Sequence, residues 1–177
     1  MDIPRRSAVS PSASGLMMLD DPKDRPARAM ASPGAFLSPS MLAAAPHRLL
    51  FFVGAANVLL AMAWWALWLV DARRQLVGLP QPAVPAGWLH AIVMQYLVLP
   101  PFIFGFLLTV FPRWMNQPAL ARWHYIPVGI GLLGGQVLTL AGLVGAPWLL
   151  HAGAVLTIAG WTCGLGWLLR LLWNESG

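Results

Sequence analysis

Four long apolar segments follow one another along the chain, separated by short polar connections. They cover about 49–70, 88–112, 126–145 and 148–173. A bilayer-spanning helix needs about 20 apolar residues. The first segment has 22 residues and, at about 1.5 Å per residue, would be roughly 33 Å long as a helix. The pattern predicts an all-α, polytopic membrane protein with four transmembrane helices over residues 47–173.

Proline and glycine positions predict how these helices are shaped and packed. Pro100 and Pro101 lie inside the second span, where they remove backbone donors and predict a kink near the membrane centre. Pro147 predicts a tight turn between the last two spans. Small-xxx-small spacings in these spans predict a closely packed hairpin, or contacts with a second copy or another membrane subunit. They are formed by Gly131 with Gly135 and by Gly160 with Gly164.

The two ends of the chain have a different composition. Residues 1–46 contain seven Pro and seven Ser with no apolar periodicity, which predicts a disordered Pro/Ser/Arg-rich tail. Residues 174–177 are expected to form a short tail after the last span.

Composition and charge argue for a membrane protein and against a nucleic-acid-binding one. The chain is 58% hydrophobic and 10% charged, and its net charge of +5 comes from basic residues in the tail and at span ends. This placement follows membrane topology, so the lipid bilayer rather than a nucleic acid is the expected partner. Lys and Arg near the span ends are six on the side of the N-terminus and two on the other, which predicts that both termini are cytoplasmic. Five Trp residues near span ends suit an aromatic belt: Trp88, Trp114, Trp123, Trp148 and Trp173.

The histidines are the candidate ligands. His90 and His151 each lie a few residues inside a span, at the same predicted depth. Two neutral imidazoles on facing helices can ligate one metal ion, or a haem iron from both sides. Met94 lies one turn after His90 and is a soft candidate neighbour. The alternative interpretation is that both histidines only hydrogen-bond loop carbonyls or lipid headgroups.

Other polar residues in or near the spans have simpler interpretations. His47 and His124 are expected to be interfacial. Asn57 and Gln136 are expected to make hydrogen bonds between helices, with a ligand role as the alternative. Cys163 is expected to be a small buried packing residue.

Three motifs resemble one family. "HRLLFF" at 47–52 opens the first span, "WLHAIVM" at 88–94 opens the second, and "GFLLTVFPRW" at 105–114 closes it. Over about 47–145 the chain resembles the NnrS family, whose second helix begins with a W-H-A-H-E-M-like motif and ends in GFLLT-A-V-P-N-W. The spacing places the family's first motif histidine on His90 and its methionine on Met94. The family's second histidine and its glutamate fall on Ile92 and Val93, which cannot bind metal.

The resemblance implies a multi-pass protein of the bacterial inner (cytoplasmic) membrane. It implies binding of haem, haem b in particular, and/or copper, with His90 as a metal-ligand position, and a role in nitric oxide metabolism and denitrification. Family members have about twelve spans. Three explanations of this chain's four spans are expected: a truncated gene, a one-domain relative, or half of an oligomeric version. No catalytic residue is indicated. The alternatives are a non-catalytic structural or assembly subunit and, third, half of a small-solute transporter.

Overall fold

The described part of the chain is a bundle of long helices. The structure, a computed structural model, describes residues 39–79 and 84–175. In these ranges four helices are long and apolar enough to cross a membrane, which confirms the predicted all-α membrane fold. The elements are α1 (Pro39–Leu42), α2 (Pro46–Arg74), α3 (Ala86–Val93), η4 (Met94–Val98), α4 (Leu99–Trp114), α5 (Arg122–Val144) and α6 (Trp148–Glu175).

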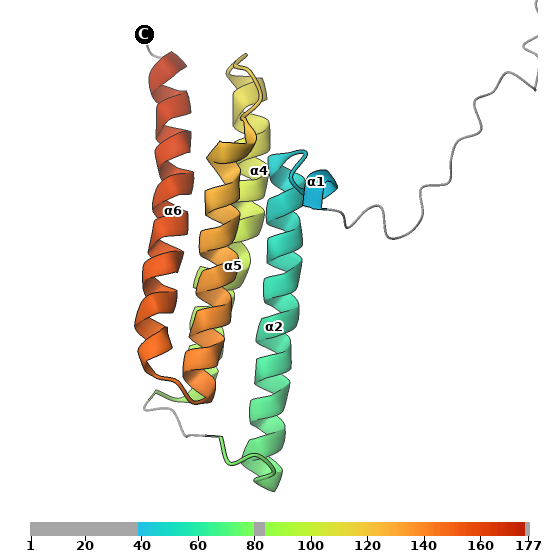
Figure 1. The fold of residues 1–177 in the computed structure, drawn as a ribbon, viewed down its shortest axis with the longest axis vertical. Coiled ribbons are helices and arrows are strands. Elements are labelled where there is room, and N and C mark those ends of the chain that lie inside the picture. The colour runs from blue at the N-terminus through green and yellow to red at the C-terminus, as the bar shows by residue number, and fades with distance from the viewer. Residues whose placement is uncertain (1–38, 80–83, 176–177) are drawn as a thin grey trace, which may run out of the picture.

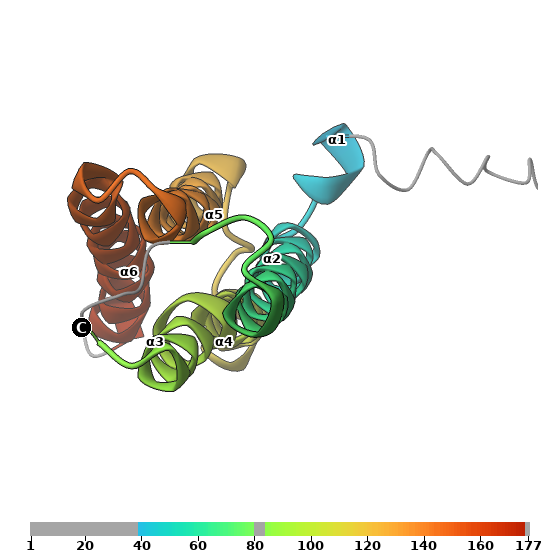
Figure 2. The same cartoon turned by 90° about the horizontal axis from the view of Figure 1, so that it is seen from below.

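The helices run side by side along one axis, with α2 and α6 on opposite sides of the bundle (Figure 1). Seen along the axis, α2, α5, α6 and the α3–α4 helix surround a common centre (Figure 2). The packing is most extensive between α5 and α6, followed by α2 against α4 and α5. The start of α2 and the end of α6 therefore lie at one end of the bundle, which we call the arginine end because Arg48, Arg113, Arg122 and Arg170 lie there.

The second span is one continuous helix with a π-helical turn rather than a sharp break. Its three parts are α3, η4 and α4, and the π-turn immediately precedes Pro100 and Pro101. Its diagnostic bond runs from the Leu99 N–H to the Met94 carbonyl, five residues earlier. The helix absorbs the prolines by widening one turn, a common response to a lost backbone donor. The sequence predicted a kink at this position, and the structure has a π-turn there.

Asn57 replaces a donor that the second span lacks. Leu97 would normally receive the N–H of the residue four positions later, but that residue is Pro101. The Asn57 side chain on α2 donates to the Leu97 carbonyl at 2.8 Å and reaches the Leu132 carbonyl on α5 at 3.4 Å. The predicted interhelical hydrogen bonds of Asn57 are confirmed, and they link three spans at their centre.

Gln136 behaves differently from the prediction. Its side chain is fully buried on α5, yet neither its amide nitrogen nor its amide oxygen has a hydrogen-bond partner. The expected interhelical hydrogen bond is therefore not made. The Leu97 carbonyl of the π-turn is bound from α2 by Asn57, whose own Oδ1 is also unpaired.

Glycine allows the α5–α6 hairpin to close. A Cβ on Gly131 would lie 2.7 Å from the Gly160 Cα, and a Cβ on Gly135 would lie 3.1 Å from the Gly153 carbonyl. Gly164 faces Phe104 of α4 instead. The predicted hairpin is confirmed. These glycines pack against other helices of the same chain. Association with a second subunit stays a prediction, and we expect it to involve other faces of the bundle.

The segment before the first span is structured from residue 39. Residues 39–46 comprise α1, a turn over 43–45 and the first residue of α2, although the sequence predicted a disordered tail as far as 46. The Tyr125 hydroxyl on α5 donates to the Ala43 carbonyl at 2.8 Å and ties this segment to the bundle. The predicted tail over 1–38 lies outside the described residues.

The distribution of large side chains fits a membrane environment. One buried cluster joins all four spans and is formed by Leu50, Val53, Phe104, Leu108, Tyr125, Val128, Leu132 and Leu168. The five predicted belt tryptophans are all exposed at helix ends. Cys163 was predicted to be buried, and this is wrong: it is exposed, because it lies on the face of α6 that points away from the other helices.

Candidate functional site

His90 belongs to an aromatic cluster between the first and second spans. Its ring stacks on Trp65 of α2, with 4.6 Å between ring centroids and 24° between planes. Trp65 also stacks on Trp68, three residues later on the same helix face, at 5.5 Å and 9°. We call Trp65, Trp68 and His90 the His90 cluster. It lies at the end of the bundle opposite the arginine end, where α2 ends and α3 begins.

Two nitrogen atoms in this cluster are buried without a partner. The His90 Nδ1 and the Trp68 Nε1 make no hydrogen bond. An unpaired buried polar group costs about 1–3 kcal/mol, so native structures rarely keep one without a reason. The indole nitrogen can only donate, whereas the imidazole Nδ1 can accept a proton or bind a metal ion in its neutral form. The cluster thus offers one buried donor and one buried ligand atom.

The other predicted ligands, Met94 and His151, have surroundings different from those of His90. Met94, one turn later, packs against the apolar cluster of Ala61, Val93, Leu97 and Val98. His151 lies near the start of α6, at the same end of the bundle, but its side chain is exposed. The His90 ring stacks toward α2 rather than toward α6. Joint ligation by His90 and His151 stays a prediction that this packing does not favour.

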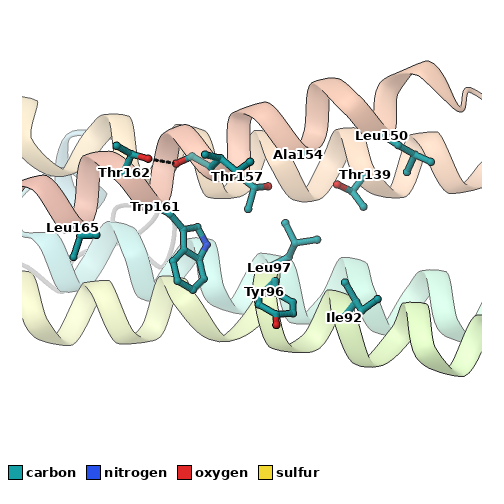
Figure 3. A pocket seen from close by; sticks show the side chains of 11 residues that line it. Ile92, Tyr96, Leu97, Thr139, Leu150, Ala154, Thr157, Trp161, Thr162 and Leu165 are labelled. Atoms are coloured by element: carbon teal, nitrogen blue, oxygen red, sulfur yellow. Dashed lines mark hydrogen bonds between the residues drawn. The ribbon is translucent and has the colours of Figure 1, made fainter.

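An apolar groove lies between the second span and α6. It has a volume of about 580 Å³, and its lining includes Ile92, Tyr96, Leu97, Leu150, Trp161 and Leu165. Figure 3 shows Trp161 and Tyr96 between the two helices, with Leu150 near one end and Leu165 near the other. The hydroxyls of Thr157 and Thr162 donate to carbonyls of their own helix at 2.8 Å. The groove therefore offers apolar surface and no histidine.

The remaining histidines have ordinary interfacial partners. His47 lies 3.5 Å from the Thr109 hydroxyl and contacts Phe51 edge-on. His124 accepts the Ala121 N–H at 3.1 Å through Nδ1. Both are at the arginine end, far along the axis from His90.

The donor set of this chain fits a group held by one histidine. In the described ranges no three His, Cys, Asp or Glu side chains gather to hold a metal ion. A metal ion that needs three protein ligands therefore does not fit the described residues, whereas one axial ligand for a haem needs only a single imidazole, which His90 carries. The sequence pointed to His90 but missed Trp65 and Trp68. Their i, i+3 spacing in a span was a usable signal, but nothing in the sequence showed that Trp65 stacks on His90.

Fold and site together define a class: a four-span membrane protein with a single-histidine aromatic cluster at one end of its bundle. A family model described as NnrS protein matches residues 41–176. The chain belongs to the NnrS family. No curated protein and no solved structure matches it.

Proposed function

We propose that this protein binds haem through His90 and acts in the bacterial nitric oxide response as an inner-membrane protein. The observation that carries the proposal is the His90 Nδ1, which is buried, stacked on Trp65 and without a protein partner. The family's association with haem, copper and nitric oxide metabolism, and the placement of its first motif histidine on His90, support the same position.

His90 alone is the protein ligand in this proposal. His151 is exposed on α6, and Ile92 and Val93 stand where the family motif has its second histidine and glutamate. A haem held by His90 would supply the site at which a diatomic gas binds. The chain's own contribution is orientation and burial. Trp65 stacks on the imidazole ring, and the buried indole N–H of Trp68, which stacks on the same Trp65, makes no hydrogen bond.

Spectroscopy on the purified protein tests the proposal. The full chain is produced with haem supplied, purified in detergent, and recorded as reduced-minus-oxidised spectra with and without nitric oxide. We expect a Soret band in the natural protein, its loss in His90→Ala, and a nitric-oxide-induced shift. The matched controls are His151→Ala and His47→Ala, which should keep the band. No band, or a band that survives in His90→Ala, would contradict the proposal.

A second candidate function is a non-catalytic assembly subunit. It is favoured by the apolar groove beside α6, which has room for a segment of a partner. Metal analysis of the same preparations shows whether the purified protein carries copper. A defined larger complex that purifies without haem or metal would favour this second function, and a haem-loaded protein purifying alone would oppose it.

A further inference from the structure

A separate pocket lies at the arginine end of the bundle, between the 115–121 connection and the last turns of α6. It has a volume of about 190 Å³, and its lining includes Gln117, Leu120, His124, Trp167, Arg170 and Asn174. We call it the Arg170 pocket. At about 30 Å³ per water molecule, its volume equals that of roughly six waters. This volume is enough for a small charged group. The pocket is separate from the His90 cluster, which lies at the other end of the bundle.

Hydrogen bonds hold the walls of this pocket in place. The Gln117 side chain donates to the Leu171 carbonyl at 3.0 Å, and this bond fastens the connection to α6. The His124 Nδ1 accepts the Ala121 N–H at 3.1 Å. Because Nδ1 is an acceptor, the neutral ring carries its proton on Nε2, which is then a donor. The pocket thus has a defined donor in addition to its arginine.

Aromatic contacts position the charged group. The Arg170 guanidinium lies over the Trp167 ring, 5.2 Å from its centroid. The His124 ring packs against the same tryptophan, with 3.9 Å between centroids. Trp167 therefore holds both the guanidinium and the imidazole, and less side-chain freedom is lost when Arg170 binds an anion.

Among the side chains that the structure describes, none supplies a negative charge beside this arginine. In 39–79 and 84–174, where side chains are described, Asp71 is the single acidic residue. It lies at the opposite end of the bundle, where its carboxylate accepts the N–H groups of Val77, Gly78 and Leu79 at 2.7, 3.1 and 2.7 Å. No described carboxylate therefore pairs with Arg170.

We propose that the Arg170 pocket binds the phosphodiester group of an anionic phospholipid. Guanidinium groups pair with phosphate through two parallel hydrogen bonds, and the His124 and Asn174 side chains supply further polar contacts. Leu120 and Leu171 provide an apolar wall, as the upper part of a lipid acyl chain requires. Trp123 and Trp173 are exposed at the same helix ends, which is the headgroup level of a membrane protein. A soluble phosphate shares the chemistry but would gain nothing from these walls.

Native mass spectrometry of the full chain tests this proposal. The protein is released from detergent micelles doped with phosphatidylglycerol or phosphatidylcholine, and retained lipid is counted. Arg170→Gln removes the charge at similar length, and Arg73→Gln at the opposite end is the matched control. One basic residue near a membrane surface contributes about 1 kcal/mol, so we expect about a fivefold lower phosphatidylglycerol retention in Arg170→Gln. Arg73→Gln should retain as much as the natural protein.

Two further arms separate the explanations. His124→Phe keeps a ring against Trp167 but removes the Nε2 donor and also the Nδ1 that accepts the Ala121 N–H. It should lower phosphatidylglycerol retention without changing phosphatidylcholine retention. Millimolar inorganic phosphate should not displace the lipid. Displacement by phosphate would overturn the lipid assignment in favour of a soluble anion, and equal losses in Arg170→Gln and Arg73→Gln would overturn the pocket itself. A haem band at His90 is unaffected by either result.

Discussion

Replacing Asn57 tests whether its side chain substitutes for the donor that Pro101 lacks. The Asn57→Leu variant removes the 2.8 Å hydrogen bond to the Leu97 carbonyl and leaves that carbonyl buried. An unpaired buried polar group costs about 1–3 kcal/mol, while polar contacts between membrane helices average about 0.6 and reach about 1.7 kcal/mol. Removing the unpaired Asn57 Oδ1 offsets part of the loss. We expect Asn57→Leu to lower the free energy of unfolding by about 1 kcal/mol.

The variant Pro101→Ala allows a stricter test of this prediction, because it would restore a backbone N–H four residues after Leu97. In the Pro101→Ala background, Asn57→Leu should cost close to nothing, so the double-mutant cycle should give a coupling energy of about 1 kcal/mol. Pro100→Ala is the matched control. It restores a donor for Tyr96 rather than Leu97, and its coupling to Asn57 should be near zero.

The measurement is reversible unfolding in mixed micelles by added SDS, followed by far-ultraviolet circular dichroism. Pro101→Ala changes stability by itself, but the cycle cancels that contribution. Equal costs of Asn57→Leu in the natural and Pro101→Ala backgrounds would refute the substitution of one donor by the other. Equal coupling of Asn57→Leu to Pro100→Ala and to Pro101→Ala would show that the loss of stability comes from the helix as a whole and not from the Leu97 carbonyl.

Two further predictions use the same unfolding assay. Gln136→Met removes an amide without partners at similar volume and should raise the free energy of unfolding by about 1 kcal/mol or more; a loss of stability would mean that the amide has a partner such as an internal water. Gly131→Ala places a Cβ against the backbone of Gly160 and should cost about 1–3 kcal/mol by overpacking. Gly166→Ala, which adds a methyl group to open space on α6, should cost nothing, and equal effects of the two alanine variants would contradict the close hairpin.

The four spans and the belt tryptophans could be predicted from the sequence because each depends on the transfer of side chains from water into the membrane. Pro100 and Pro101 likewise marked the position of the irregular turn, since a missing N–H is a property of the residue itself. Gly131 and Gly160 indicated the hairpin for a similar reason: absent side chains permit close backbones whichever helix approaches.

The tertiary structure decided which way each helix faces. It turned His90 toward Trp65, left His151 and Cys163 outside, gave Asn57 a carbonyl to bind and gave Gln136 none. In water, burial of the apolar face sets the rotation of a helix, and periodicity in the sequence records it. In a bilayer, lipid tails are as apolar as a neighbouring helix, so apolar residues surround each span and the pattern carries little information about rotation. Sequence alone therefore determined where this chain crosses the membrane, while packing between helices determined which of its few polar side chains meet.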